Sequence, residues 1–177
     1  MRLKYKDLVV RTSVMDDVPQ LTRWWNDGAV MAHAGFPNGL GTTETETARC
    51  IGRGCCIIEE AGRPIGECCY RGAGTGAAEI GIKICEADCQ NRGVGRIVLS
   101  LLIRWLFDSG YETVVLDTNL KNLRAQHVYE SLGFRKLRVN ADAWEDQLGR
   151  LQSSVDYALT EADFINFAAY PDNGKCL

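Results

Sequence analysis

The sequence has few of the residues and patterns that mark a metal site. Its 177 residues include only two histidines, His33 and His127, and no two of its cysteines form a Cys-x-x-Cys pair. Tetrahedral zinc sites are built from such clusters, so we expect no bound metal. The cysteines lie mostly in apolar runs, where a thiol behaves as a small hydrophobic group, and we expect them to be reduced and largely buried. They are Cys50, Cys55, Cys56, Cys68, Cys69, Cys85, Cys89 and Cys176.

Long apolar runs and an excess of one charge are also missing. No stretch is apolar enough to span a membrane, and residues 1–7 are too polar for a signal peptide. The formal net charge of −3 gives no general affinity for nucleic-acid backbones. No repeat, linker or low-complexity tract interrupts the chain. We therefore expect a single domain over residues 1–177 in the cytoplasm, with no nucleic-acid or membrane partner.

A glycine-broken loop, Gln90 to Arg96, separates a strand pattern from a helix pattern. Residues 78–84 alternate apolar and other side chains, as a half-buried strand does. Residues 96–109 have an apolar stripe, with Ser100 among the polar residues of the opposite face. Backbone N–H groups and the helix dipole favour an anion at such a junction, and Arg92 and Arg96 can pair with phosphate. An ordinary turn with solvated arginines explains the same residues.

The loop differs from two better-known phosphate loops. A P-loop requires a lysine shortly after its last glycine, and none follows Gly95. The dinucleotide fingerprint requires a third glycine, and Val98 stands in that position. The pattern that remains is Gln-x-x-Gly-x-Gly.

A second pattern follows in residues 116–134. Asn122 heads a predicted helix that contains Ala125 and Tyr129 and stops at Gly133-Phe134. Together the two patterns, over residues 78–134, resemble the pyrophosphate loop and the second acetyl-CoA signature of the GNAT acetyltransferase superfamily. The segment Leu21 to Asp27 is similar to the Rim-type branch, which acetylates protein N-termini, and to relatives that act on aminoglycosides and other small amines.

The remaining segments agree with that family. The patterns predict further strands at 8–11, 54–60, 65–70, 113–117, 134–139 and 153–159 and helices at 16–25 and from Thr42 or Thr43 to about Ile51. Residues 28–41 are expected to be a connection, and residues 141–152 to be helical or irregular. The fold class is α/β (α+β). The resemblance implies a mixed, mostly antiparallel sheet of about six or seven strands flanked by helices and splayed near its middle to admit acetyl-CoA.

The resemblance also implies where acetyl-CoA binds. The pyrophosphate would contact the loop amides, and the pantetheine arm would pair like an extra strand with the preceding strand. Two asparagines would contact the arm or the thioester. The cofactor-binding candidates are Ile82, Lys83, Ile84, Gln90, Arg92, Gly93, Val94, Gly95, Arg96, Asn119, Asn122 and Ala125.

Proton transfer needs an acid and a base. Tyr129 stands where family members have the acid that protonates the departing thiolate. A phenol suits this role because its pKa of ~10 is higher than the pKa of ~8.5 of a thiol. A core aromatic would explain Tyr129 as well. Asp117 and Glu79 are the candidates for the base that deprotonates the amine, and each is also explained as an ordinary carboxylate. Glu59, Glu60 and Glu67 remain further candidates.

The acceptor groove is expected to use aromatic and histidine side chains outside the two signatures. These candidates are Trp24, Trp25, His33, Phe36 and Trp144, although aromatic residues at helical spacing also suit a core. The acidic cluster Asp142, Glu145 and Asp146 could attract a cationic amine, but a solvated face explains it better.

The predicted function is N-acetylation of a primary amine, either a protein N-terminus or a small molecule, by direct attack on acetyl-CoA in a ternary complex. Transfer of a longer acyl group, or to a hydroxyl, fits the same motifs. A non-catalytic acyl-CoA-binding sensor or interaction module on the same fold is the alternative. A homodimer is expected only from family habit.

Overall fold

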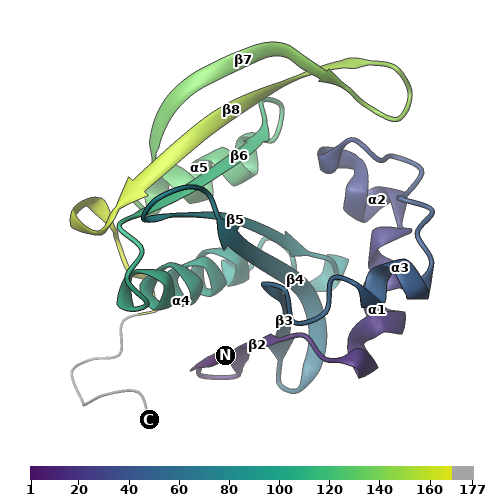
Figure 1. Cartoon of the computed structure of the whole chain (residues 1–177), viewed down its shortest axis with the longest axis horizontal. Helices are drawn as coiled ribbons and strands as arrows, with labels where there is room; N and C mark the ends of the chain where they lie inside the picture. The colour runs from purple at the N-terminus through teal and green to yellow at the C-terminus, as the bar shows by residue number, and fades with distance from the viewer. Residues whose placement is uncertain (169–177) are drawn as a thin grey trace.

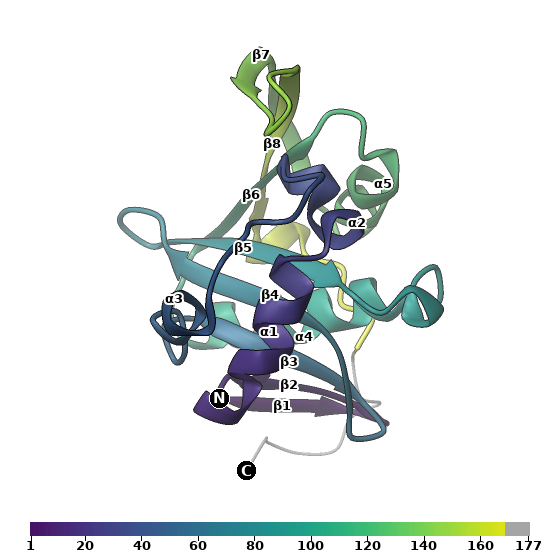
Figure 2. The same ribbon diagram turned by 90° about the vertical axis from the view of Figure 1, so that its right-hand side faces the viewer.

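The strands form one eight-stranded sheet in the computed structural model, which describes residues 1–168 (Figures 1 and 2). The order is β1-β2-β3-β4-β5-β6-β8-β7. The strands are β1 (Arg2–Tyr5), β2 (Leu8–Thr12), β3 (Cys55–Glu60), β4 (Arg63–Gly72), β5 (Ala77–Ile84), β6 (Thr113–Asn119), β7 (Arg135–Glu145) and β8 (Leu151–Thr160). The α-helices are α1 (Val18–Trp25), α2 (Gly28–Met31), α3 (Glu44–Ala48), α4 (Val94–Asp108) and α5 (Leu123–Ser131). Short 3-10 turns are η1 (Met15–Asp17), η2 (Ala32–Ala34), η3 (Ala87–Cys89) and η4 (Glu161–Asp163).

The sheet opens between β5 and β6. These strands are parallel and pair only from Ala77 to Glu79 with Thr113 to Val115, whereas β4 follows β5 as far as Ile84. Residues 80–84 therefore have a neighbouring strand on one side only. In Figure 1, β6, β8 and β7 diverge from the layer formed by β3, β4 and β5. The predicted mixed, splayed sheet is confirmed.

Helices cover both faces of the sheet. Val98, Leu102 and Leu106 of α4 are fully buried in the main core, which α5 also joins through Tyr129. A smaller core on the other face contains Trp24 of α1. None of the helices in residues 1–168 is long and apolar enough to cross a membrane.

One residue of α4 departs from the predicted amphipathic pattern. Ser100 was expected on the exposed face, but it is fully buried and its Oγ accepts a hydrogen bond from the backbone N–H of Phe167 at 3.1 Å. The segment that contains Phe167 covers this face of α4, a contact that periodicity within the helix does not reveal.

Three local predictions need correction. The first strand, β1, was missed, so the sheet has eight strands rather than six or seven. Residues 28–41 include α2 and η2, and Asp27 caps α2 by accepting the backbone N–H of Ala29 at 2.8 Å. Residues 141–152 are not helical: they complete the β7–β8 hairpin. Its register shifts between Asn140 and Trp144, which disrupts the period-two pattern from which a strand is predicted.

Most of the cysteines in the described residues are buried, as predicted. Of the seven cysteines in residues 1–168, all unpaired, five are buried, while Cys50 and Cys69 are exposed. Cys176 lies outside the described residues.

Candidate functional site

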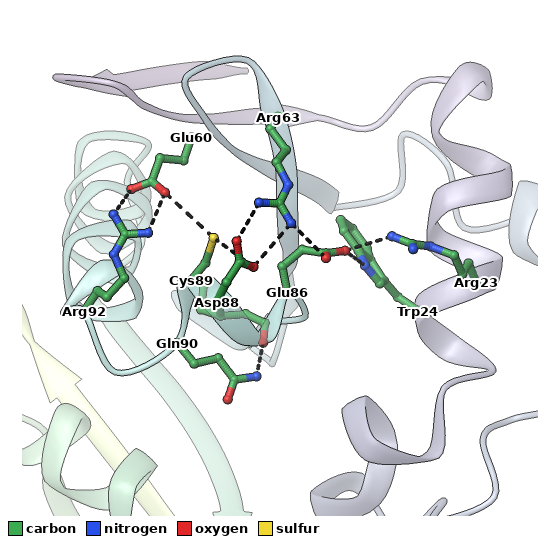
Figure 3. Close-up of polar contacts among 10 residues, drawn as sticks. Arg23, Trp24, Glu60, Arg63, Glu86, Asp88, Cys89, Gln90 and Arg92 are labelled. Atoms are coloured by element: carbon green, nitrogen blue, oxygen red, sulfur yellow. Dashed lines mark hydrogen bonds and ion pairs between the residues drawn. The ribbon is translucent and has the colours of Figure 1, made fainter.

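The loop before α4 is held in place by side chains of α1 and β4 and by one of its own side chains. Glu86 accepts hydrogen bonds from Arg23 and from the indole N–H of Trp24, both at 2.8 Å, and from Arg63 at 3.1 Å (Figure 3). Gln90 donates from Nε2 to the carbonyl oxygen of Ile84 at 2.9 Å. These contacts fix the loop against the end of β5.

The loop presents backbone N–H groups at the start of α4. Asn91 and Gly93 both have left-handed backbone, with φ of 59° and 79°, and Gly93 is the residue before the helix. The first N–H groups of a helix have no partner within it, and the positive end of the dipole lies there. A helix of 15 residues therefore begins with an arrangement suited to an anion.

The cations around this loop are not the pair that the sequence suggests. Arg92 points to β3 and makes two hydrogen bonds with Glu60, at 2.9 and 3.1 Å, so its charge is already compensated (Figure 3). Arg96 lines the cavity and lies 4.2 Å from the ring centre of Phe167. Arg124 of α5, which the sequence reasoning missed, lines the cavity too and donates to Asn91 Oδ1 at 3.0 Å. Arg124 lies in the first turn of the helix that Asn122 caps, and this position could have identified it from the sequence.

A cavity of about 810 Å³ runs from this loop into the opening between β5 and β6. Most of the predicted site residues line it together. They are Ile82, Lys83, Ile84, Gln90, Gly93, Val94, Gly95, Arg96, Asp117, Asn119, Asn122, Ala125 and Tyr129, with His33 and Trp144 from the acceptor set.

The two asparagines already have structural hydrogen bonds. Asn122 caps α5, because its Oδ1 accepts the backbone N–H of Ala125 at 3.2 Å. Asn119 donates to Gln152 Oε1 at 3.1 Å and accepts the backbone N–H of Lys121 at 2.9 Å.

The two candidates for proton transfer, Tyr129 and Asp117, both line the cavity. Tyr129 is 7% exposed, and its hydroxyl has no hydrogen-bond partner within residues 1–168. Burial, with the charge of Asp117, raises the pKa of Tyr129 to about 12, so the phenol keeps its proton at neutral pH. Asp117 lies near the end of β6, two residues before Asn119. Partial burial of its carboxylate raises the pKa of Asp117, and the charges of Glu79 and Asp156 act in the same direction.

Five predicted site residues do not line the cavity. Glu79 makes a bidentate ion pair with Arg71, at 2.6 and 3.0 Å, and Arg92 is paired as described above. Trp24 is 2% exposed and belongs to the core. Trp25 donates its indole N–H to Glu67 at 2.9 Å, and Phe36 lies outside the cavity wall. Helical spacing could not separate core aromatics from groove aromatics.

The part of the chain described by the structure has no group of three or more metal-binding side chains.

Known structures share this architecture. An acetyltransferase of the GNAT family from Bacillus anthracis is 17% identical, with a TM-score of 0.78 over 92% of this chain and 99% of that chain. The ribosomal L7/L12 alpha-N-protein acetyltransferase RimL, in complex with coenzyme A, is 16% identical, with a TM-score of 0.80 over 90% of this chain and 98% of that chain. The spermidine N-acetyltransferase from Vibrio cholerae, in complex with coenzyme A and spermine, is 18% identical, with a TM-score of 0.78 over 89% and 97% of the two chains.

At these identities the structural likeness establishes the fold, and the Rim-type enzymes expected from the opening segment are among the neighbours. No curated protein sequence matches the chain. The sequence model of the acetyltransferase (GNAT) family matches residues 18–134, well over half of the 177. The chain therefore belongs to the GNAT family of acetyltransferases.

Proposed function

We propose that this protein transfers the acetyl group of acetyl-CoA to a primary amine by direct attack within a ternary complex. The observation that carries the proposal is the single cavity that contains the α4 loop, the unpaired edge of β5, Asp117 and Tyr129. Its volume of about 810 Å³ suits a small-molecule site. Coenzyme A needs these same features: an anion site for its phosphates, backbone partners for its amide arm and polar groups at its thioester.

The residues that would hold the cofactor follow from this arrangement. Backbone N–H groups near Gly93 and Val94, with Arg96 and Arg124, would bind the phosphates. The unpaired backbone between Ile82 and Ile84 would pair with the arm as an added strand does. Asn119 and Asn122 would contact the arm near the thioester.

The proposed chemistry forms one bond and breaks another. The amine nitrogen attacks the thioester carbon, so a C–N bond forms and the C–S bond breaks. Amines with pKa values of ~8–10 are mostly protonated at neutral pH, so Asp117 would accept the amine proton, directly or through water. Tyr129 would donate its hydroxyl proton to the departing sulfur. Glu79 is the weaker candidate for the base because Arg71 neutralises it.

The experiment that tests the proposal measures acetyl-CoA binding and turnover separately. Acetyl-CoA should raise the melting temperature, since a ligand that binds only the folded state stabilises it. Thiol release should then be followed with peptides, amino acids, polyamines and aminoglycosides. Binding without thiol release for any amine would favour the acyl-CoA sensor. No thermal shift at saturating acetyl-CoA would refute cofactor binding.

A further inference from the structure

An ion pair at the wall of the cavity has no part in the proposed chemistry. Glu67 of β4 lies directly opposite Lys83 of β5 in the sheet register, and Lys83 Nζ donates to Glu67 Oε1 at 3.1 Å. The same oxygen accepts the indole N–H of Trp25 at 2.9 Å. Glu67 is 5% exposed, so the carboxylate is enclosed and two donors hold it in place.

Lys83 reaches the cavity, whereas Glu67 does not. On β5, Ile82 and Ile84 face α4, where both lie 4.0 Å from the position that a Cβ would take on Gly95. Since side chains alternate along a strand, Lys83 points to the opposite face, which α1 and α2 cover. Ala29, Val30 and His33, from α2 and η2, line the same cavity. Lys83 therefore belongs to the acceptor side rather than to the phosphate loop.

The Lys83 ammonium is charged and has donors to spare. Burial alone would lower the pKa of Lys83, but the charge of Glu67 and its hydrogen bond outweigh burial, and the pKa is raised. An ammonium group has three N–H donors. Within residues 1–168, Glu67 is the single hydrogen-bond partner of this group. Two donors remain for a ligand.

The acidic groups that a polycation would need are elsewhere. Among the described residues, Asp117 is the one carboxylate that lines the cavity. Of the acidic cluster near the hairpin tip, Asp146 accepts the backbone N–H groups of Leu148 and Arg150 and a side-chain N–H of Gln152. Asp142 and Glu145 lie outside the cavity wall. A polyamine would find Asp117 as the one carboxylate in the cavity wall, together with the Lys83 ammonium.

We propose that Lys83 binds a carboxylate carried by the acceptor close to its reacting amine. The acceptor class is then an amine with a nearby carboxylate: a free amino acid, or a peptide with an acidic side chain near its N-terminus. Glu67 and Trp25 are positioning residues, which hold the ammonium at the cavity wall. This inference rests on the proposed acetyl transfer and names its acceptor.

The test compares matched acceptors in matched variants. Alanine is compared with alaninamide, and the peptide Ala-Asp-Gly-amide with Ala-Asn-Gly-amide, by the ratio of kcat/KM within each pair. The members of a pair differ in amine pKa, but that difference is the same for every enzyme variant. The comparison of wild type with Lys83→Met and Lys83→Arg therefore isolates the side chain.

We expect one ratio to fall about tenfold in Lys83→Met, because a hydrogen bond between charged groups is lost. Lys83→Arg restores that hydrogen bond and should largely retain the ratio. The pair that responds identifies the source of the carboxylate. Because Lys83→Met leaves Glu67 unpaired, the double variant Lys83→Met, Glu67→Gln is measured as well; its amide oxygen still accepts the indole N–H of Trp25.

Two results would overturn the inference, and they are distinguishable. Ratios that are the same in wild type and in the Lys83→Met variants, with acetylation still occurring, refute carboxylate recognition alone. Absence of acetylation of every amine by the wild type refutes the proposed function and this inference with it.

Discussion

The indole of Trp144 covers the α-carbon of Gly35 and leaves no room there for a side chain. Gly35 has a left-handed backbone, with φ of 92°, and ends η2. Gln147, at the hairpin tip, adds three hydrogen bonds to this contact. Its backbone N–H donates to the Gly35 carbonyl oxygen at 2.8 Å. Its side chain accepts the backbone N–H of Asn38 at 2.9 Å and donates to the Gly39 carbonyl oxygen at 3.0 Å. The β7–β8 hairpin is thus joined to the segment after α2, beside the part of the cavity that His33 and Trp144 line.

Replacing Gly35 tests this contact. Gly35→Ala introduces a methyl group against the indole in a strained backbone, and we expect a loss of about 2–4 kcal/mol in the free energy of unfolding. Gly41→Ala is the matched control, because Gly41 is also left-handed, with φ of 67°, but has open space around its α-carbon. It should cost about 1 kcal/mol. Equal losses in urea unfolding would show that the Trp144 contact contributes nothing.

Arg124 and Arg92 should differ in their effect on acetyl-CoA. Arg124→Ala and Arg96→Ala each remove a cation from the cavity, and we expect each to weaken acetyl-CoA binding about tenfold. Arg92→Ala removes a cation that Glu60 already pairs, and the dissociation constant should change less than about threefold. Calorimetric titration measures all three. A larger effect from Arg92→Ala would contradict the placement of the phosphates.

Tyr129→Phe should separate catalysis from binding. The phenol proton is lost, so kcat should fall by about 100-fold or more, as for general acids elsewhere, while the acetyl-CoA dissociation constant stays within about threefold. Steady-state kinetics and calorimetry test the two parts.

Tyr157→Phe is the control for Tyr129→Phe. Tyr157 is a neighbouring ring, 5.9 Å away between centroids, whose hydroxyl donates to Glu130 at 2.9 Å and does not line the cavity. Removing that hydroxyl should lower stability by about 1 kcal/mol and leave kcat nearly unchanged. Full activity in Tyr129→Phe would refute the assigned acid.

Asp17 makes stability depend on pH in a predictable direction. Its carboxylate is nearly buried and accepts two hydrogen bonds from Arg11, both at 2.7 Å, and one from the backbone N–H of Val14 at 2.8 Å. Burial alone would raise the pKa of Asp17, but these hydrogen bonds outweigh it and the pKa is lowered from 3.8. The stabilisation is therefore present above pH 3.8 and is lost as the pH falls through the lower, folded-state pKa.

Asp17→Asn should accordingly cost about 1–2 kcal/mol at pH 7, because Arg11 loses one of its two carboxylate partners and keeps Glu59 at 2.7 Å. The difference from wild type should shrink below pH 3.8. Asp16→Asn changes an adjacent, exposed carboxylate and serves as the control. A difference that does not depend on pH in thermal melts would contradict the assignment.

Features encoded over a few residues were predictable. The alternation of residues 78–84, the glycines before α4 and the Asn122 cap each specify local backbone geometry, and the structure has β5, the loop and α5 at those places. The family signatures combine such local features, so the fold and most of the cavity wall follow from them. The strand residues 141–145 and 151–152 were not predicted, because a shift in register hides the strand pattern.

The sequence by itself determined the family, the open sheet and most of the residues that line the cavity. Only the tertiary structure decided which charged groups are available there. Arg92 has the same local context as Arg96, yet Glu60, 32 positions away, pairs with it, and Arg124 contacts the loop from 33 positions away. Likewise, Lys83 has a buried carboxylate partner because β4 places Glu67 opposite it. Local sequence specifies hydrogen bonding and periodicity along the chain, whereas the pairing of charges depends on which distant segments the fold brings together.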